Sequence, residues 1–274
     1  MIDLHLHTTH SDGLDTPEIL AAKAKAAGLT VIAATDHDTM DGVPALERAA
    51  AQLGLRCVTG IEITASHEGR DIHVLGYFLD YRSRSLTGFL EEQRLDRIRR
   101  AREIGERLSA LGVGIDMEQV IAGAGDRPVC RPAMAQALVD RGHVPSFRAA
   151  FDLYVGEGRP AYVPRVGVTP AHALAVIVNA GGIASMAHPG RTQADEAVPA
   201  MVDAGLGAIE VYHTDHTALE RRKYRAMATR LGLAVTGGTD YHGDERYHAG
   251  ELGAVSLPGR AFDDLCRRPR REPA

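Results

Sequence analysis

Histidine and carboxylate side chains recur where the predicted strands of this 274-residue chain end. The set consists of His5, His7, Asp12, Asp36, His37, Glu62, His73, His188, His213, Asp240 and His242. His5 and His7 are two residues apart, as are Asp240 and His242, and side chains at that spacing share one face of a strand. A single histidine most often has a structural role, but so many ionisable groups are costly to bury together unless they bind cations. We therefore expect a divalent metal site.

The donor atoms of this set indicate which ions it would bind. They are nitrogen and oxygen without sulfur, which favours manganese, iron or zinc over ions that select thiolates. The candidates exceed the needs of one ion, so we expect two or three ions with Glu62 as a bridge. Three divalent ions facing Asp12, Glu62 and Asp240 would leave an excess of about three positive charges, which suits a phosphate dianion. Sites of this kind activate a bridging water for in-line displacement at phosphorus.

Short β-rich runs alternate with alanine-rich helical runs along most of the chain. The seven predicted strands lie in IDLHLH, LTVIAATDHD, RCVTGIEITA, RDIHVLGYFLD, GGIASMAHP, AIEVYH and LAVTGGTDYH. Helices are predicted over residues 17–27, 43–53, 170–180, 194–204 and 219–231. This alternation predicts an α/β fold with parallel strands in a distorted, TIM-like (β/α)7 barrel. The active sites of such barrels lie at the C-terminal strand ends, so the candidate ligands should converge there.

The alternation stops between residues 81 and 166. Ser83 to Leu111 has the pattern of one long amphipathic helix with a run of arginines, and shorter helical runs follow without a strand. We predict that residues 1–80 and 167–274 form the metal-binding barrel, and that residues 81–166 form a helical cap that contributes to substrate binding. The arginine run is typical of a solvated helix face, and an RNA-binding surface is the alternative.

Composition and charge argue against several classes of protein. The formal net charge is −5, which disfavours coating nucleic acid through overall charge, although a local basic patch could still hold a phosphate chain. Cys57, Cys130 and Cys266 are far apart and outside any CxxC pattern, so we expect neither a disulfide framework nor a thiolate zinc site. Neither a secretion signal nor a long apolar run is evident. We expect a cytoplasmic protein without membrane association or an obligate protein partner.

Six segments in order resemble the PHP family, named after polymerase and histidinol phosphatase domains. They are DLHLHTTHSDG, ATDHDTMDG, GIEITA, IHVLGY, MAHPG and GTDYH. Within the family the chain looks most like a bacterial branch of nucleoside 3′,5′-bisphosphate phosphatases and 5′ to 3′ exoribonucleases. The segments HDTMDG, RPAMAQALV, GRPAYVPR and EVYHTDHT support that branch.

The resemblance implies three metal sites. The first would be held by His5, His7, Glu62 and Asp240, the second by Asp12, His37 and His242, and the third by Glu62, His73 and His188. Asp12 stands where other PHP branches carry His, which makes the second site richer in oxygen. In the third site, His73 and His188 could instead contact the phosphate directly. Manganese is the first ion expected, with iron or zinc as alternatives.

The resemblance also implies which side chains hold substrate phosphates. They are Arg131, Arg165 and His213, with His216 as a further contact. Arg131 would in addition stabilise charge on the reacting phosphoryl group, and His213 or a metal-bound water would protonate the leaving group. Ala133 stands where relatives often have His, and Arg165 where Lys is common, which exchanges a compact ammonium for a planar fork.

The expected activity is hydrolysis of terminal phosphate esters of nucleotides by a metal-bridging hydroxide. The substrate would be a nucleoside 3′,5′-bisphosphate, giving the 5′-monophosphate, or the 5′ end of a short RNA, or both. A phosphatase of the histidinol phosphate type and an amide or lactone hydrolase are alternatives. Alternatives of another class are a non-catalytic, metal-loaded module of the kind found in replicative polymerases, and an RNA-binding scaffold.

Overall fold

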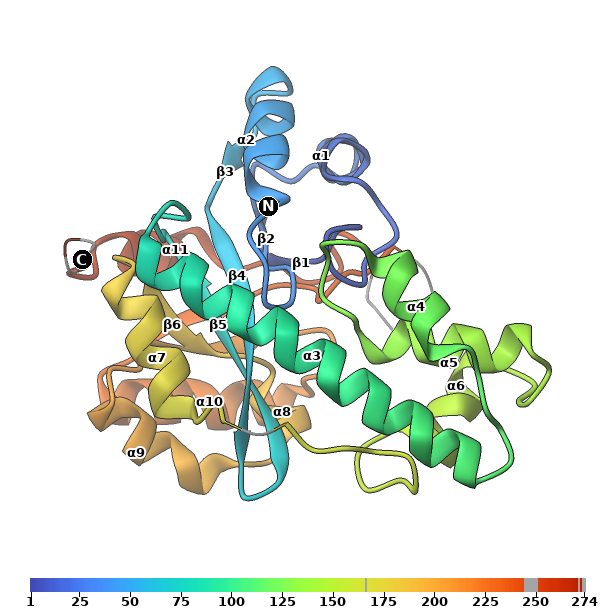
Figure 1. Cartoon of the computed structure of the whole chain (residues 1–274). Helices are drawn as coiled ribbons and strands as arrows, with labels where there is room; N and C mark the ends of the chain where they lie inside the picture. The colour runs from blue at the N-terminus through green and yellow to red at the C-terminus, as the bar shows by residue number, and fades with distance from the viewer. Residues whose placement is uncertain (166, 244–250, 271, 273–274) are drawn as a thin grey trace.

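A computed structural model describes residues 1–165, 167–243, 251–270 and 272, and its strands form two sheets (Figure 1). The three-stranded sheet has the order β1 (Ile2–Leu6), β2 (Val31–Ala34) and β3 (Arg56–Cys57), all parallel. The five-stranded sheet has the order β4 (Gly60–His67), β5 (Arg70–Tyr77), β6 (Ile183–Met186), β7 (Ala208–Tyr212) and β8 (Ala234–Gly237). Every residue of β1, β2 and β6 is buried, as expected for strands covered on both faces.

Strand β5 does not run parallel to its neighbours. It pairs antiparallel with β4, placing Thr64 opposite His73, and antiparallel with β6, whereas β6, β7 and β8 are parallel. The prediction of parallel strands throughout is therefore wrong at β5. The reason is the two-residue turn at Glu68 and Gly69, both of which have positive φ, the conformation of a tight β-hairpin. A parallel connection would need a crossover of a dozen or more residues.

The two sheets meet at two single bridges rather than along a continuous ladder. Leu6 forms a parallel bridge with Tyr241, and His37 forms one with Glu62. Within the described ranges the hydrogen bonding does not close a ring, so the fold is mixed α/β and the predicted (β/α)7 barrel is not confirmed. Both bridges lie at or next to candidate ligands, so they bring together the strand ends that carry them.

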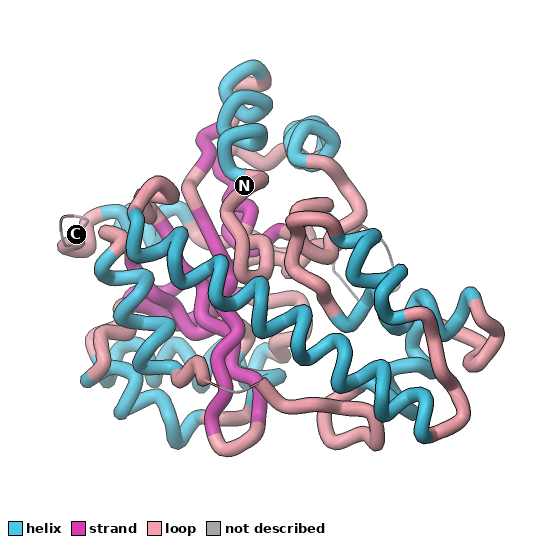
Figure 2. Tube along the Cα trace, viewed as in Figure 1, coloured by secondary structure: helices cyan, strands magenta, loops and turns pink. Residues whose placement is uncertain are grey.

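Helices pack around the sheets close to where the sequence predicts them (Figures 1 and 2). They are α1 (Pro17–Ala26), α2 (Val43–Gln52), α7 (Pro170–Asn179), α8 (Pro189–Thr192), α9 (Val198–Asp203) with a 3-10 turn at Asp195–Ala197, α10 (Ala218–Leu231) and α11 (Gly259–Cys266). The side chain of Thr16 caps α1, and Thr217 forms a reciprocal capping box with Glu220 at the start of α10. The short helix α8, directly after His188, and α11 were not predicted.

The segment between β5 and α7 is helical. It contains α3 (Arg84–Ala110), α4 (Met117–Ala124), α5 (Arg131–Asp140), α6 (Phe147–Ala150) and a π-helical turn at Phe151–Val155. Figure 2 shows α3 running from beside the sheet to the lobe formed by the later helices, and no described residue of that lobe is in a strand. The lobe has its own apolar core, which includes Ile104, Leu108 and Met134. The boundaries of the predicted insertion stay a prediction. None of the helices described has the length and apolar character needed to cross a membrane.

Candidate metal centre

Glu62, on β4, lies at the centre of the predicted ligands. Its Oε2 atom is 3.5 Å from His5 Nε2, 3.3 Å from His7 Nε2 and 3.1 Å from His37 Nδ1. Its Oε1 atom is 2.9 Å from His73 Nδ1 and 3.1 Å from Nε2 of His188. The side chain is 1% exposed, so one carboxylate faces five imidazoles with almost no contact with solvent.

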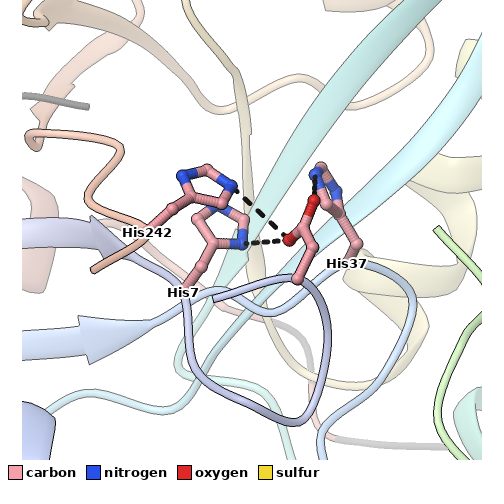
Figure 3. Close-up of side chains that lie close together, drawn as sticks. His7, His37 and His242 are labelled. Atoms are coloured by element: carbon pink, nitrogen blue, oxygen red, sulfur yellow. Dashed lines mark ion pairs between the residues drawn. The ribbon is translucent and has the colours of Figure 1, made fainter. Parts of the chain in front are cut away.

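Asp240 and Asp12 extend the cluster on either side of His7. Asp240 Oδ1 lies 3.3 Å from His5 Nε2 and 3.2 Å from His7 Nε2. Figure 3 shows His7, His37 and His242 turned toward a single carboxylate, which is that of Asp12. Its oxygens are 3.5 to 3.8 Å from the three rings. These separations leave room for an ion between the donor atoms, because ligand atoms sit about 2.0–2.2 Å from a bound transition metal.

The ligand atoms form overlapping groups in which all atoms lie within 4.8 Å of one another. Among described residues these groups are His7, Asp12, His37 and His242; His5, His7, Glu62 and Asp240; His37, Glu62 and His73; and His5, Glu210 and His213. The first three correspond closely to the three predicted sites. His188 joins the third through its contact with Glu62. All nine predicted ligands therefore meet in one place, and their roles as ligands stay a prediction.

Several buried donor and acceptor atoms of the cluster have no hydrogen-bond partner. They are Nε2 of His5, both ring nitrogens of His7, Oδ1 of Asp12, Nδ1 of His37, Oε2 of Glu62, Nδ1 of His188 and Nε2 of His213. An unsatisfied buried polar group costs about 1–3 kcal/mol, and one such group in a folded protein needs an explanation. Because most of these atoms point into the same space and are nitrogen or carboxylate oxygen, the residues present fit divalent cations.

The charges of the cluster favour added positive charge. Burial alone would raise the pKa of Glu62, but the attraction of His37 and His73 outweighs it and holds the pKa well below its usual value. Burial would lower the pKa of His7, yet the facing carboxylates of Asp240 and Glu62 raise it to about 10. The carboxylates therefore stay ionised, and either protons on imidazoles or bound cations must balance them.

Two of the converging residues have strained backbone. His188 has φ of 28° and Asp240 has φ of 57°, backbone conformations that residues other than glycine adopt only uncommonly. The backbone of Asp240 is held by a hydrogen bond from its N–H to the carbonyl of His5, and the N–H of His188 donates to Glu210 Oε2. Strain of this kind persists only when the surroundings enforce it, and it is concentrated at functional sites.

Glu210, inside β7, is a carboxylate of the cluster that the sequence analysis does not include. It is fully buried; Oε1 accepts from His5 Nδ1 at 3.0 Å and Oε2 accepts from the His188 N–H at 2.7 Å. A proton on Nδ1 of His5 leaves Nε2 with a lone pair facing Glu62 and Asp240. Glu210 therefore orients one predicted ligand through its ring and another through its backbone, the usual arrangement behind a metal-binding histidine.

We expect Glu210→Gln to weaken metal binding about 10- to 100-fold, the usual cost of losing such a carboxylate. The reason is that Glu210 accepts with both oxygens, whereas an amide has one acceptor and places an N–H₂ against a donor. Manganese affinity can be measured from the rise in Tm as the ion is titrated. Glu92→Gln, at an exposed position on α3, is the control, and an unchanged affinity for Glu210→Gln would rule out this role.

Two further buried aspartates hold the segments that carry ligands. Asp36 accepts hydrogen bonds from the backbone and hydroxyl of Thr8 and from the hydroxyl of Ser11, which fixes the loop that contains Asp12. Asp3 accepts from the backbone and hydroxyl of Thr239, the residue before Asp240. Asp36 thus positions the loop that carries Asp12 and does not contact the His37 side chain.

Arg165 is buried in an ion pair. Its Nη2 lies 2.7 Å from Asp38 Oδ2, and Nη1 donates to the carbonyl of Thr64 and to the Gln93 side chain. Arg97, from α3, forms a second ion pair with the same oxygen of Asp38 at 2.6 Å. Arg165 borders the cavity over the metal centre, but its guanidinium is already paired with Asp38, whose single charge it shares with Arg97. The geometry gives it a structural role, and its predicted contact with substrate stays untested.

Arg131 and Arg100 border the same cavity, and their guanidinium groups have fewer charged or hydrogen-bonding partners than that of Arg165. Arg131 is partly exposed at the start of α5, and its Nη2 lies 3.2 Å from Asp71 Oδ2. Arg100, which sequence reasoning missed, donates from Nε to the Val163 carbonyl, and its buried Nη2 has no partner. Burial and the nearby Arg131 lower the pKa of Arg100 to about 10, so it remains charged at neutral pH. Both guanidinium groups lie over the ring of Tyr162.

The cavity itself has a volume of about 300 Å³. Its wall combines the metal centre with arginines from the sheet-forming part of the chain and from the helical segment between β5 and α7. They are Arg70, Arg97, Arg100, Arg131, Arg165 and Arg191. Arg191, on α8, donates to Asp240 Oδ2 at 3.0 Å and is half exposed. A polar, cationic cavity of this size beside a cluster of metal ligands suits a phosphorylated small molecule.

His213 and His216 do not line this cavity as predicted substrate contacts would. His213 accepts from the Asp215 N–H through Nδ1, which leaves its proton on Nε2, 3.6 Å from Asp240 Oδ2. Both nitrogens of His216 face backbone, Nδ1 at the Val211 carbonyl and Nε2 at the Gly190 N–H. In this geometry both ring nitrogens of His216 contact backbone and His213 faces Asp240, so the phosphate contacts expected of these two residues stay predictions.

The fold, the metal-ligand cluster and the arginine-lined cavity define a PHP-type metal-dependent phosphoesterase, and the chain belongs to the PHP family. The model of the PHP domain matches residues 3–126. A 3′,5′-nucleoside bisphosphate phosphatase of Chromobacterium violaceum is 33% identical over 248 residues, covering 88% of this chain and 87% of the relative. A 5′-3′ exoribonuclease of Haemophilus influenzae is 34% identical over 245 residues, covering 88% and 89%.

A solved structure extends the similarity to the fold. A putative metal-dependent phosphoesterase from Bifidobacterium adolescentis superposes with a TM-score of 0.88 at 32% identity, covering 97% of this chain and 96% of that one. The similarity therefore includes the helical lobe as well as the two sheets. The predicted family and hydrolase class are confirmed.

Proposed function

We propose that this hydrolase cleaves phosphate esters of a substrate in which two phosphates lie close together, either a nucleoside 3′,5′-bisphosphate, giving the 5′-monophosphate, or the 5′ end of a short RNA, releasing nucleotide. The observation that supports this most is the pairing of a metal-ligand cluster with a cavity lined by arginines from α3, α5 and α8. One phosphate can occupy the cluster while the arginines hold a second. The names of the relatives from Chromobacterium violaceum and Haemophilus influenzae are consistent with both substrates.

The proposed ligands are the nine predicted ones: His5, His7, Asp12, His37, Glu62, His73, His188, Asp240 and His242. Two or three divalent ions, manganese first, would be bound, and Glu62 would be shared between sites because both of its oxygens face imidazoles. When bound, such ions supply Lewis acidity, which polarises a phosphoryl oxygen and makes water a stronger nucleophile near neutral pH. A cytoplasmic location also remains part of the proposal.

Residues that line or border the cavity would bind the substrate phosphates and position the ligands. Arg131 and Arg100 would bind the non-bridging oxygens of the substrate, Arg131 by moving from Asp71 and Arg100 through its unpartnered Nη2. Residues 81–166 would therefore serve as the cap that brings cations to the metal centre. His213 would hold Asp240 in place from Nε2, and water in the cavity would protonate the leaving oxygen, since His213 does not line the cavity.

The α3 arginines do not favour the RNA-scaffold alternative. Three arginines on the surface of α3 pair with neighbouring acids, Arg94 with Glu91, Arg99 with Asp96 and Arg102 with Glu118. Two others, Arg97 and Arg100, are buried. A surface whose cations are already paired attracts phosphate chains weakly, so binding and cleavage should both depend on the metal centre.

Removal of metal tests the proposed function. We expect a chelator to abolish hydrolysis of adenosine 3′,5′-bisphosphate and of a short 5′-phosphorylated RNA, and added manganese to restore it. Release of phosphate and nucleotide is measured for both, with AMP and histidinol phosphate as comparison substrates. Preferred hydrolysis of histidinol phosphate, or full activity in chelator, would contradict the proposal. RNA binding that survives the chelator without cleavage would support the scaffold instead.

A further inference from the structure

A second cleft of about 600 Å³ opens beside the metal centre. It lies between the loop that carries Asp12 and helices α4 and α5 of the lobe. Three residues line both this cleft and the cavity over the metal centre, namely Asp12, Cys130 and Pro132. The cleft and the cavity over the metal centre therefore adjoin one another at these three residues.

The cleft wall is largely apolar. Leu14 is 44% exposed and Phe147 partly exposed, and the small side chains of Ala124, Ala133 and Ala137 leave the space open. Apolar side chains that stay accessible in a concave site favour a ligand with an apolar face. Phosphate would gain little here, because the cleft lacks the density of arginines found in the neighbouring cavity.

Most polar groups of the cleft already have partners. Asp116 accepts from the Gln119 backbone as the cap of α4, and the Arg127 guanidinium donates to the carbonyls of Thr9 and of two residues in α4. Gln136 donates to Asp140. Arg127 thereby ties α4 to the Asp12 loop and fixes the width of the cleft. These contacts leave apolar surface with a few polar atoms at its edge, which matches the face and rim of a heteroaromatic base.

We propose that this cleft binds the nucleobase of the substrate while its phosphates occupy the metal centre and the arginine-lined cavity. The proposal rests on the proposed nucleotide substrate and adds the part of the site that recognises a base. A cleft of about 600 Å³ falls within the roughly 300–1,000 Å³ of pockets that enclose small ligands. Stacking on an aromatic or apolar surface tolerates every base. The cleft would therefore favour substrates that carry a base over substrates that lack one, without distinguishing among the bases.

The first test narrows the cleft from α5. Ala133→Trp places an indole in the space, and Ala122→Trp, on an exposed turn of α4 outside the cleft, is the matched control. KM and kcat are measured for adenosine 3′,5′-bisphosphate and for the ribose 3,5-bisphosphate that lacks the base. We expect Ala133→Trp to raise KM about tenfold for the nucleotide, the order of one lost base stack, and to leave the base-free substrate nearly unchanged. Equal effects on both substrates would overturn the proposal.

The second test measures binding without activity. The chain contains no tryptophan, so Phe147→Trp introduces a single fluorophore at the cleft wall. In chelator, AMP at up to millimolar concentration should quench its fluorescence saturably, and ribose 5-phosphate should not. Absence of quenching by AMP, or equal quenching by both, would exclude a base in this cleft. Quenching by AMP together with no hydrolysis of any nucleotide would refute the proposed function while supporting the cleft.

Discussion

Replacing Glu62 by glutamine is expected to lower kcat by at least about a thousand-fold. Glu62 faces five imidazoles with its two oxygens, and glutamine keeps the shape but loses the charge and one acceptor. Loss of a shared ligand removes electrostatic stabilisation worth several kcal/mol, and each 1.4 kcal/mol corresponds to a tenfold change in rate. Phosphate release from adenosine 3′,5′-bisphosphate at saturating manganese gives the measurement.

Glu92→Gln controls for the loss of one negative charge elsewhere. It is exposed on α3 and should keep wild-type kcat. Circular dichroism and Tm of both variants separate a local defect from unfolding. A Glu62→Gln enzyme that folds, is saturated with manganese and turns over within about tenfold of wild type would contradict the central role of this carboxylate.

Asp38→Asn is expected to cost about 3–5 kcal/mol in the free energy of unfolding. Asp38 is the carboxylate that pairs with both Arg97 and Arg165, and all three side chains are nearly inaccessible to solvent. Arg97 and Arg165 hold the pKa of Asp38 at about 2, below its usual value despite burial. The amide leaves two buried guanidinium groups without a counter-charge. Asparagine also tolerates the positive φ of 51° at this position, so the change tests charge rather than backbone strain.

The measurement is denaturant unfolding, with a Tm decrease of roughly 10 °C as the thermal counterpart. Glu91→Gln removes the partner of Arg94 in a solvated pair on the same helix, and should cost less than about 1 kcal/mol. If the two variants lose similar stability, the Asp38 pairs are not the link between α3 and the sheets that the geometry indicates.

The candidate ligands could be predicted because local sequence patterns decide where they lie. His5 and His7 share a face by the alternation of a strand, and the strand ends bring them near Glu62 and Asp240. No comparable pattern marks Glu210, which lies inside a buried strand where a lone carboxylate does not stand out. Its partners, His5 and His188, are distant in the chain, so the network becomes visible only in three dimensions.

The barrel prediction was incomplete for a local reason. The Glu68–Gly69 turn makes β4 and β5 a hairpin, and glycine at the second position of a two-residue turn between two β-rich runs is the local feature that indicates it. The ion pair that buries Arg165 could not be predicted, because its partner Asp38 lies 127 residues earlier in the chain. Spacing predicts which residues share an element, but not which charges neutralise one another across elements.

The most direct test of the central claim is the metal content of active protein. Inductively coupled plasma mass spectrometry on dialysed, manganese-reconstituted enzyme, with the Glu62→Gln variant in parallel, counts the ions bound per chain. The converging ligands predict at least two ions in the wild type and fewer in the variant. Full phosphatase activity in protein that contains no transition metal would contradict the account.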